Sequence, residues 1–201
     1  MKKIIIIGAS GHGKVVADIA IDNGYRVLGF LDDDATKSDN YGFPVLGRID
    51  DAVQFEGCEF IIAIGNNAVR KKIAEKYTRL KYATLVHSEA VVSASVRLGD
   101  GTVIMPMAVI NADTVVGKHC IINSASIVEH DSRLGDYVHI SPGAILCGTV
   151  NVGQCTWIGA GVTVINNVSI CGDCVIGAGA VVTRDIMDIG TYVGIPIRRI
   201  R

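Results

Sequence analysis

The stretch from Ala90 to Asp185 decides the fold, and it opens AVVSAS-VRLGDG-TVIMPM-AVINAD-TVVGKH-CIINSA, a repeat with a period of six. The third residue of every unit, from Val92 to Val182, is Val, Ile or Leu, and no unit needs an insertion to stay in register. The first residue of every unit is small or β-branched. A large aliphatic residue at every sixth position, with a smaller one two residues before it, predicts a narrow solenoid with short flat faces.

A second period, of eighteen residues, is superimposed on the first. Gly99, Gly117, Gly135 and Gly153 follow this spacing, each directly after an aliphatic residue. Because eighteen is three sixes, three faces make one turn, and we expect each glycine to mark a corner where the backbone is left-handed. The apolar period excludes an α-helix, and the β-branched content favours strands. The sequence therefore predicts a left-handed parallel β-helix of hexapeptide repeats over residues 86–201.

The first 85 residues predict a Rossmann-like α/β domain. We expect strands at residues 3–8, 26–31 and 60–64, with a glycine loop and helix after the first and a second helix after the third. This alternation is typical of a parallel βαβ sheet, whereas the turn-rich segment 37–51 is expected to be a surface loop. Ligands of such sheets bind over the carboxyl ends of the strands, where residues 10–13, 32–33 and 65–66 would converge.

The glycine loop predicts a phosphate site, because backbone N–H groups at a helix N-terminus bind anions. An acidic residue about twenty positions later commonly contacts a ribose or a base, and Asp32 stands there. The spacing Gly8-x-x-Gly11-x-Gly13 differs from the dinucleotide fingerprint, and only three strands precede the repeat. A mononucleotide or nucleotide-sugar pocket therefore fits better than the dinucleotide site of an oxidoreductase.

The composition narrows the possible partners. The formal net charge is −1 and the basic residues are scattered, which argues against nucleic acid. The apolar run Ile4-Ile7 is too short to span a bilayer and lacks the flanks of a signal peptide, so we expect no membrane insertion and a cytoplasmic location. The six cysteines include one C-x-x-C, Cys171 and Cys174, without a second pair at zinc spacing. We expect reduced structural thiols and no metal.

One polar cluster departs from the packing pattern of the solenoid. Glu129, His130 and Asp131 are consecutive, at positions where other units carry surface residues of no fixed type. An imidazole beside a carboxylate has the parts of a general base, because the carboxylate can fix the ring tautomer and raise its basicity. A lone histidine on a solenoid is more often a surface residue, and we expect this for His119.

Several motifs follow one another along the chain: Gly8-Ala9-Ser10-Gly11-His12-Gly13, Leu31-Asp32-Asp33, Ala63-Ile64-Gly65-Asn66-Asn67 with Arg70-Lys71-Lys72, Glu129-His130-Asp131, His139 to Ala144, and the tail Val193-Gly194-Ile195-Pro196. Together they resemble the bacterial sugar O-acyltransferase group related to sialic acid O-acetyltransferases. Within that group the chain is most similar to the nucleotide-activated 4-amino-sugar N-acetyltransferases of the bacillosamine and perosamine type. In the tail, Ile197-Arg198 replaces the usual Ala-Lys.

The resemblance implies roles for the residues at matching positions. His130 would be the base that deprotonates the acceptor as it attacks the thioester of acetyl-CoA, and Asp131 would raise the basicity of that ring. His139 would contact the acetyl-CoA end, and Ala160 and Ala178 would line the pantetheine channel through backbone contacts. The nucleotide-sugar pocket would comprise Ser10, Gly11, His12, Asp32, Asp33 and Gly65.

The resemblance also implies a homotrimer with each active site between two subunits. Outward positions of the repeat are more apolar than a lone solvated prism should show, which gives a physical reason for assembly. They are Val103, Val109, Val115, Ile121, Ile127 and Ile145. An apolar groove between subunits could also bury the pantetheine arm of acetyl-CoA.

The function that the resemblance implies is acetyl transfer from acetyl-CoA to the 4-amino group of a nucleotide-linked 4-amino-deoxy sugar. Attack would be direct, because no cysteine lies beside His130 in the motif. Two alternatives stay open. The same base could act on a hydroxyl of sialic acid or another sugar, or the chain could be a non-catalytic trimer that binds sugar nucleotides. Binding of a bare nucleotide diphosphate would favour the N-acetyltransferase over the sialic acid enzyme.

Overall fold

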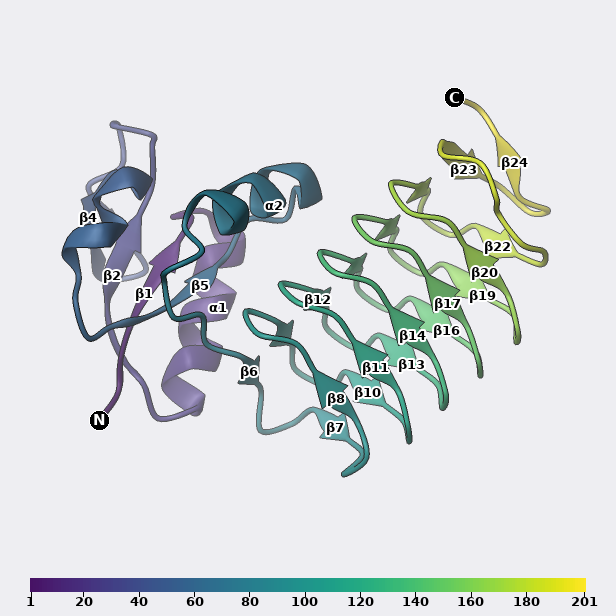
Figure 1. The fold of residues 1–201 in the computed structure, drawn as a ribbon, viewed down its shortest axis with the longest axis horizontal. Coiled ribbons are helices and arrows are strands. Elements are labelled where there is room, and N and C mark those ends of the chain that lie inside the picture. Colours follow the sequence, from purple (N-terminus) through teal and green to yellow (C-terminus); the bar gives the residue numbers. More distant parts are fainter.

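The computed structural model describes residues 1–201, which form an α/β domain followed by a solenoid (Figure 1). The α/β domain contains one five-stranded sheet in the order β3-β4-β2-β1-β5. Its elements are β1 (Lys3–Ile7), α1 (Gly11–Asp22), β2 (Arg26–Leu31), β3 (Asp39–Asn40), β4 (Phe43–Gly47), the 3-10 helix η1 (Ile49–Gln54), β5 (Glu59–Ile62) and α2 (Asn67–Lys76). The three expected strands are confirmed as β1, β2 and β5, and the expected helices follow β1 and β5.

The segment 37–51 is not the surface loop that its turn residues predict. It contains β3 and β4, and β4 pairs in parallel with β2 while β3 pairs antiparallel with β4. Phe43 and Val45 pack on one side of the sheet and Leu46 on the other, and this burial stabilises strands that are too short to show a clear alternation. The sheet is therefore mixed and larger than the sequence indicates.

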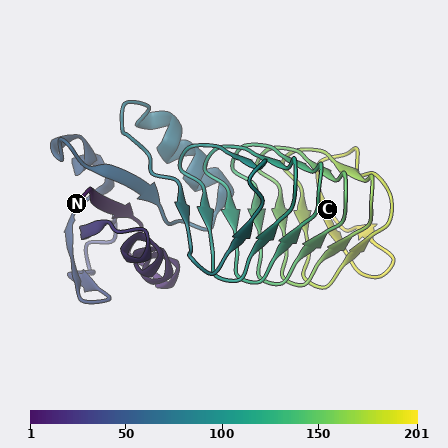
Figure 2. The same ribbon diagram turned by 90° about the horizontal axis from the view of Figure 1, so that it is seen from below.

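The solenoid stacks short strands into three sheets, parallel except for the last strand, which form the faces of a prism (Figure 2). Face 1 holds β6 (Leu85–Val86), β9 (Val103–Ile104), β12 (Ile121–Ile122), β15 (His139–Ile140), β18 (Trp157–Ile158), β21 (Val175–Ile176), β23 (Thr191–Val193) and the antiparallel β24 (Arg198–Arg199). Face 2 holds β7 (Val91–Val92), β10 (Val109–Ile110), β13 (Ile127–Val128), β16 (Ile145–Leu146), β19 (Thr163–Val164) and β22 (Val181–Val182). Face 3 holds β8 (Arg97–Leu98), β11 (Val115–Val116), β14 (Arg133–Leu134), β17 (Asn151–Val152) and β20 (Ser169–Ile170).

The residues of the repeat are buried as their six-residue period predicts. The aliphatic third residues from Ile104 to Val182 are buried in one continuous core, and small first residues such as Ala108 and Cys120 fill the corners beside them. Each coil donates backbone hydrogen bonds to the next, as from Ile121 to the Val138 carbonyl. The predicted α/β domain followed by a left-handed parallel β-helix is confirmed.

The glycine column does not have the left-handed backbone that its spacing suggests. Positive φ falls two residues later in the repeat, at positions that include Asp131 (φ 60) and Tyr137 (φ 62). Gly99 is needed for a different reason: a Cβ there would lie 2.5 Å from the Gly117 carbonyl carbon of the next coil. The eighteen-residue period thus marks a corner where stacked backbones approach too closely for any side chain.

The α/β domain packs against the start of face 1. Val103 and Ile121, whose side chains point outward from the prism, are 1% exposed because they join the core of this domain beside β1 and α1. Two of the six apolar outward residues are thus covered within the chain itself, so these two give no reason for assembly. The half-buried outward residues of face 2, Val109, Ile127 and Ile145, have no such cover.

No helix in the chain combines the length and apolarity required to cross a bilayer.

Candidate active site

The glycine loop, the end of β5 and β15 meet where the α/β domain joins face 1. The Nδ1 atom of His139 lies 3.3 Å from the carbonyl oxygen of Gly65. His12 lies close enough to His139 for the two rings to influence each other electrostatically. Three residues that are far apart in the sequence therefore lie together at this junction. We call the candidate nucleotide-sugar pocket that they mark the junction pocket, and Ser10 and Gly11 are exposed at the start of α1 beside it.

The start of α1 has the properties of an anion site. Ser10 occupies the N-cap position, yet its side chain makes no capping hydrogen bond, so it is free to meet a ligand together with the first N–H groups of the helix. The Nε2 atom of His12 is buried without a partner. Burial, helped by the positive charge of Arg70, lowers the pKa of His12 to about 4. A neutral imidazole with an unused nitrogen suits hydrogen bonding to a phosphate.

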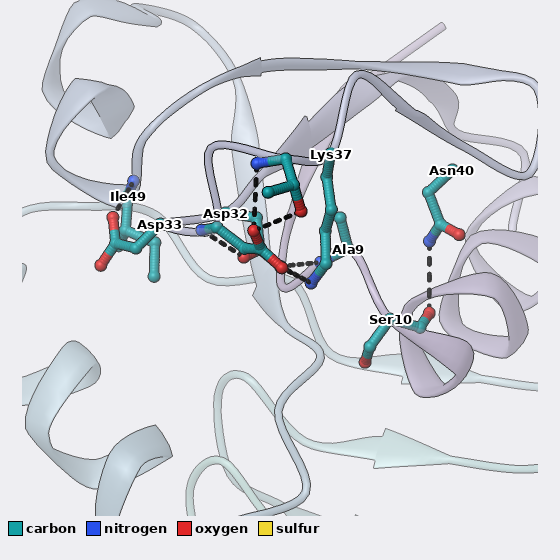
Figure 3. A network of polar contacts seen from close by, with 9 residues as sticks. Ala9, Ser10, Asp32, Asp33, Lys37, Asn40 and Ile49 are labelled. Atoms are coloured by element: carbon teal, nitrogen blue, oxygen red, sulfur yellow. Dashed lines mark hydrogen bonds and ion pairs between the residues drawn. The ribbon is translucent and has the colours of Figure 1, made fainter.

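Asp32 anchors the glycine loop through hydrogen bonds (Figure 3). Its Oδ2 accepts hydrogen bonds from the Ala9 backbone at 2.7 Å and from the Lys37 ammonium at 2.9 Å, and its Oδ1 accepts one from Asp34. Partial burial opposes ionisation, but these hydrogen bonds keep the pKa of Asp32 below its usual value. Asp33 instead accepts a hydrogen bond from the backbone of Ile49, at 3.1 Å.

Sequence reasoning missed the contribution of the segment around β3 to this pocket. The buried side chain of Asn40 donates a hydrogen bond to the carbonyl of Ser10 at 3.2 Å, and Lys37 approaches from the same segment (Figure 3). Both residues lie in the stretch expected to be a loop. Lys37 brings a positive charge beside the anion site, and it lies just before β3, which pairs with β4.

His139 is held as a neutral ring with a defined tautomer. Its Nδ1–H faces the Gly65 carbonyl, and its Nε2 accepts a hydrogen bond from Asn123 at 3.3 Å. Burial first, and then the charge of Arg70, lowers the pKa of His139 to about 4. The ring also stacks on Trp157, with centroids 5.8 Å apart, and the Trp157 indole donates to Ser141 at 2.7 Å. Trp157 is 46% exposed and gives the pocket an aromatic edge that sequence reasoning missed.

His119 is not the surface residue that its isolation in the sequence suggested. It is 5% exposed, its ring stacks on Tyr137, and it packs edge to face with Tyr82. Burial, with the charge of Arg70, lowers the pKa of His119 to about 4. The residue is buried because α2 docks on this corner, where Arg70 donates to the His119 carbonyl at 2.7 Å.

The second group of predicted residues lies on the corner between faces 2 and 3. His130 and Asp131 form the turn between β13 and β14, and the His130 Nδ1–H donates to the Asp131 carboxylate at 2.8 Å. This hydrogen bond and the adjacent negative charge raise the pKa of His130. Both side chains are more than half exposed. The arrangement directs the unprotonated Nε2 away from the carboxylate, as a general base requires.

The neighbouring coils leave room for the His130 ring. A Cβ at Gly148, one coil further along the same corner, would lie 2.8 Å from both Cε1 and Nε2 of His130. On the same corner, Glu129 accepts a hydrogen bond from Asn111 at 2.9 Å. The glycine at position 148 thus has a specific steric role that the repeat pattern alone did not reveal.

Ala160 and Ala178 lie on a third part of the surface, the corner between faces 1 and 2. Both are exposed, and the backbone N–H groups of both donate no hydrogen bond within the chain. The residues that follow them do bond to the previous coil, as Gly161 does to the Pro142 carbonyl. Two free N–H groups, eighteen residues apart on one corner, fit the amide and carbonyl groups of a pantetheine arm.

The chain alone does not assemble these groups. His130 stands at one edge of face 2, whereas Ala160 and Ala178 stand at the opposite edge, and the junction pocket lies on face 1. No group of three or more His, Cys, Asp and Glu side chains is arranged to hold a metal ion. All six cysteines are free, and the Sγ atoms of Cys171 and Cys174 are 3.4 Å apart.

Comparisons with known proteins agree with this architecture. Residues 3–77 match the model of the PglD N-terminal domain family. Among curated proteins, UDP-N-acetylbacillosamine N-acetyltransferase of Bacillus subtilis (strain 168) is 40% identical over 108 residues, which cover 50% of each protein. The chain thus spans about half the length of this relative.

Solved structures match along almost the whole chain, as two of them illustrate. The acetyltransferase domain of PglB from Neisseria gonorrhoeae FA1090, in complex with acetyl coenzyme A, superposes with a TM-score of 0.95 at 38% identity and covers 99% of both chains. A variant of perosamine N-acetyltransferase from Caulobacter crescentus, in complex with CoA and GDP-perosamine, gives 0.95 at 35% identity over 100% of this chain and 98% of that one. The chain therefore belongs to the bacterial family of hexapeptide-repeat sugar acetyltransferases that contains the bacillosamine and perosamine N-acetyltransferases.

Proposed function

We propose that the protein transfers the acetyl group of acetyl-CoA to the 4-amino group of a nucleotide-linked 4-amino-deoxy sugar, with His130 as the general base. The observation that carries this proposal is the His130–Asp131 pair, which presents an unprotonated Nε2 on an exposed corner. The neutral amine attacks the thioester carbonyl while His130 Nε2 takes its proton. The tetrahedral intermediate then collapses, the C–S bond breaks, and the CoA thiolate leaves and can take the proton from His130.

The junction pocket is the proposed site of the nucleotide. The diphosphate would lie on the N-terminus of α1, near His12 and Lys37, where the helix dipole and the ammonium favour negative charge. Asp32 would act through the glycine loop, because its oxygens already bond to that loop and to Lys37. Ala160 and Ala178 would hold the pantetheine arm of acetyl-CoA through their free N–H groups.

The working enzyme would be a homotrimer that brings these groups together across subunits. The outward residues of face 2 include Val91, Val109, Ile127 and Ile145, which form an apolar column without cover from the α/β domain. Packing of face 2 around a threefold axis would place the His130 corner of one subunit beside the Ala160 corner of the next. The site is split between two corners of one chain, which supports assembly as a condition for catalysis.

Acceptor mass after incubation with acetyl-CoA tests the proposal. UDP-linked and GDP-linked 4-amino sugars and free sialic acid form the panel, and His130→Ala is the matched variant. We expect one added acetyl group on a nucleotide-linked amino sugar, with turnover reduced by about 10²–10⁴-fold in His130→Ala.

Each other result has a defined meaning. Acetylation of sialic acid, and of no nucleotide-linked sugar, would change the assigned substrate and would leave His130 as the assigned base. Near-wild-type turnover by His130→Ala would refute the assignment of the base. Nucleotide binding without any acetyl-CoA binding would identify a non-catalytic sugar-nucleotide protein instead.

A further inference from the structure

Arg70 is the largest fully buried side chain of the protein, and all five of its N–H groups have acceptors. Nε donates to the His119 carbonyl at 2.7 Å, and one terminal nitrogen donates to the carbonyls of Ile64 (2.9 Å) and Gly65 (3.2 Å). The other terminal nitrogen donates to the Asn67 side chain and to the Tyr137 carbonyl, both at 2.8 Å. One side chain on α2 thus joins the end of β5 to two successive coils of the solenoid.

None of these acceptors is a carboxylate, although burying an unpaired cation is costly. Burial lowers the pKa of Arg70 to about 10, so the guanidinium still carries its charge near neutral pH. An apolar side chain would suffice to join two domains, and replacing buried charges by apolar groups is often neutral or stabilising. The positive charge of Arg70 and its planar set of five N–H donors therefore indicate a role beyond packing.

The carbonyl of Gly65 connects that role to the junction pocket. It accepts from Arg70 at 3.2 Å and also faces the Nδ1 atom of His139 at 3.3 Å. Arg70 also bonds the carbonyl of Tyr137, two residues before His139. The guanidinium thus controls both the backbone that leads to the ring and the acceptor that fixes its tautomer.

We propose that Arg70 is a positioning residue of the junction pocket, which fixes the Gly65 carbonyl and, through it, the His139 ring against the solenoid. The residue does not touch the ligand. The proposal deepens the proposed function, since it assigns what aligns the nucleotide-binding loop with the solenoid part of the pocket, but its geometry is a property of the unliganded chain.

Histidine NMR of the unliganded protein tests this directly. Side-chain ¹⁵N and ¹³Cε1 signals, with the His139 signal assigned through His139→Asn, report tautomer and pKa. The groups that face the ring are His12, Arg70, the Gly65 carbonyl, Asn123 and Trp157. Arg70→Met removes both the charge and the planar set of N–H donors, whereas Arg70→Lys keeps the charge alone. Lys72→Met, which removes an exposed cation on the same helix, is the matched control.

We expect wild type and Lys72→Met to keep the Nδ1–H tautomer, with a His139 pKa of about 4. Arg70→Met should lose the single tautomer and raise the pKa of His139, whereas Arg70→Lys should lose the tautomer and keep the pKa low. With an acceptor that wild type acetylates, both variants should lose about 10²-fold in kcat/KM for the acceptor, as a displacement of about 1 Å does. The loss should lie in KM more than in kcat, because His130 stands on another corner.

An unchanged His139 tautomer and pKa in both Arg70 variants, with only a lower Tm, would show that Arg70 merely joins the domains and would overturn the proposal. Where Arg70→Met does not fold, Asn67→Ala decides instead, because it removes one acceptor of the guanidinium and leaves the charge in place. A His139 signal identical to wild type in a folded Asn67→Ala and Arg70→Lys would also overturn it. The NMR result stands even if no acceptor is acetylated, so failure of the two proposals can be told apart.

Discussion

At the scale of single residues, the proposed catalysis depends on the protonation of His130. The hydrogen bond to Asp131 raises the pKa of the ring above the 6.5 of a free histidine. A general base works only when neutral, so activity should rise with pH as His130 loses its proton. The same carboxylate that makes the ring a stronger base thus moves its working range upward in pH.

Asp131→Asn should change the pH profile in a defined direction. Loss of the carboxylate lowers the pKa of His130, so the acidic limb of kcat should move to lower pH. Turnover on the plateau should fall by roughly tenfold, less than for His130→Ala, because the ring remains as a weaker base with a less certain orientation. Rates across a pH series for both proteins check this. A limb that stays in place would show that a group other than His130 sets it.

Gly148→Ala should impair catalysis through His130. The new Cβ would overlap the ring at 2.8 Å, and since the ring is exposed it can move away at little cost in stability. We expect kcat to fall by about 10²-fold with little change in Tm. The double variant with His130→Ala is the control: if Gly148 acts only through the ring, adding Gly148→Ala to His130→Ala should cost nothing further. Additive losses would contradict this steric role.

At the scale of elements, the end of β2 should govern nucleotide binding through the glycine loop. Asp32→Asn removes the charge that pairs with Lys37 and weakens the acceptor for the Ala9 N–H. Calorimetric titration with UDP and with GDP should show about tenfold weaker binding of the nucleotide that wild type binds. Asp34→Asn, whose carboxylate caps a local turn with Thr36, is the control and should bind as wild type does. Equal affinities for all three proteins would exclude a role for Asp32.

The inner residues of the solenoid were predictable because their environment is local and periodic. Ile104, Ile122 and Ile140 occupy the same position in successive coils, so the repeat alone specifies their burial. His130 and Asp131 were predictable because they are adjacent and their hydrogen bond crosses a single turn. Each of these features can be deduced from spacing along the chain.

The features that the sequence did not predict depend on contacts between distant residues. Arg70 bonds to carbonyls 49 and 67 positions away, and the burial of His119 follows from that docking. Val103 is an outward position of the repeat, and it is buried only because the α/β domain covers it. In the segment 37–51, the short strands are stabilised by pairing with β2 rather than by their own alternation. Tertiary packing determines the burial and the partners of these residues. Such contacts leave no periodic pattern in a single sequence from which they could be predicted.

At the scale of the whole molecule, the chain presents three separate parts of the proposed site. The α/β domain and face 1 form the junction pocket, the corner between faces 1 and 2 carries Ala160 and Ala178, and the corner between faces 2 and 3 carries His130. A closed trimer repeats each part three times and can bring different parts together at every interface. We therefore expect the base of one subunit to act on a sugar held by another.

Subunit complementation tests this claim most directly. Gly11→Asp should fold, because a Cβ there meets no atom within 4 Å and an acid suits a helix N-terminus. Its carboxylate should repel the diphosphate and abolish transfer. His130→Ala should also be inactive as a homotrimer. In mixed trimers formed from equal amounts of the two, about a quarter of the sites would combine an intact pocket with an intact base from the neighbouring subunit.

We therefore expect each variant alone to transfer almost no acetyl group, and co-assembled trimers to recover about a quarter of the wild-type rate. Wild type mixed and reassembled in the same way gives the reference rate, and mass measurement of the intact assemblies confirms that both variants are present in one trimer. Mixed trimers that stay as inactive as the parent variants would contradict the account, because they would show that the pocket and the base must belong to the same chain.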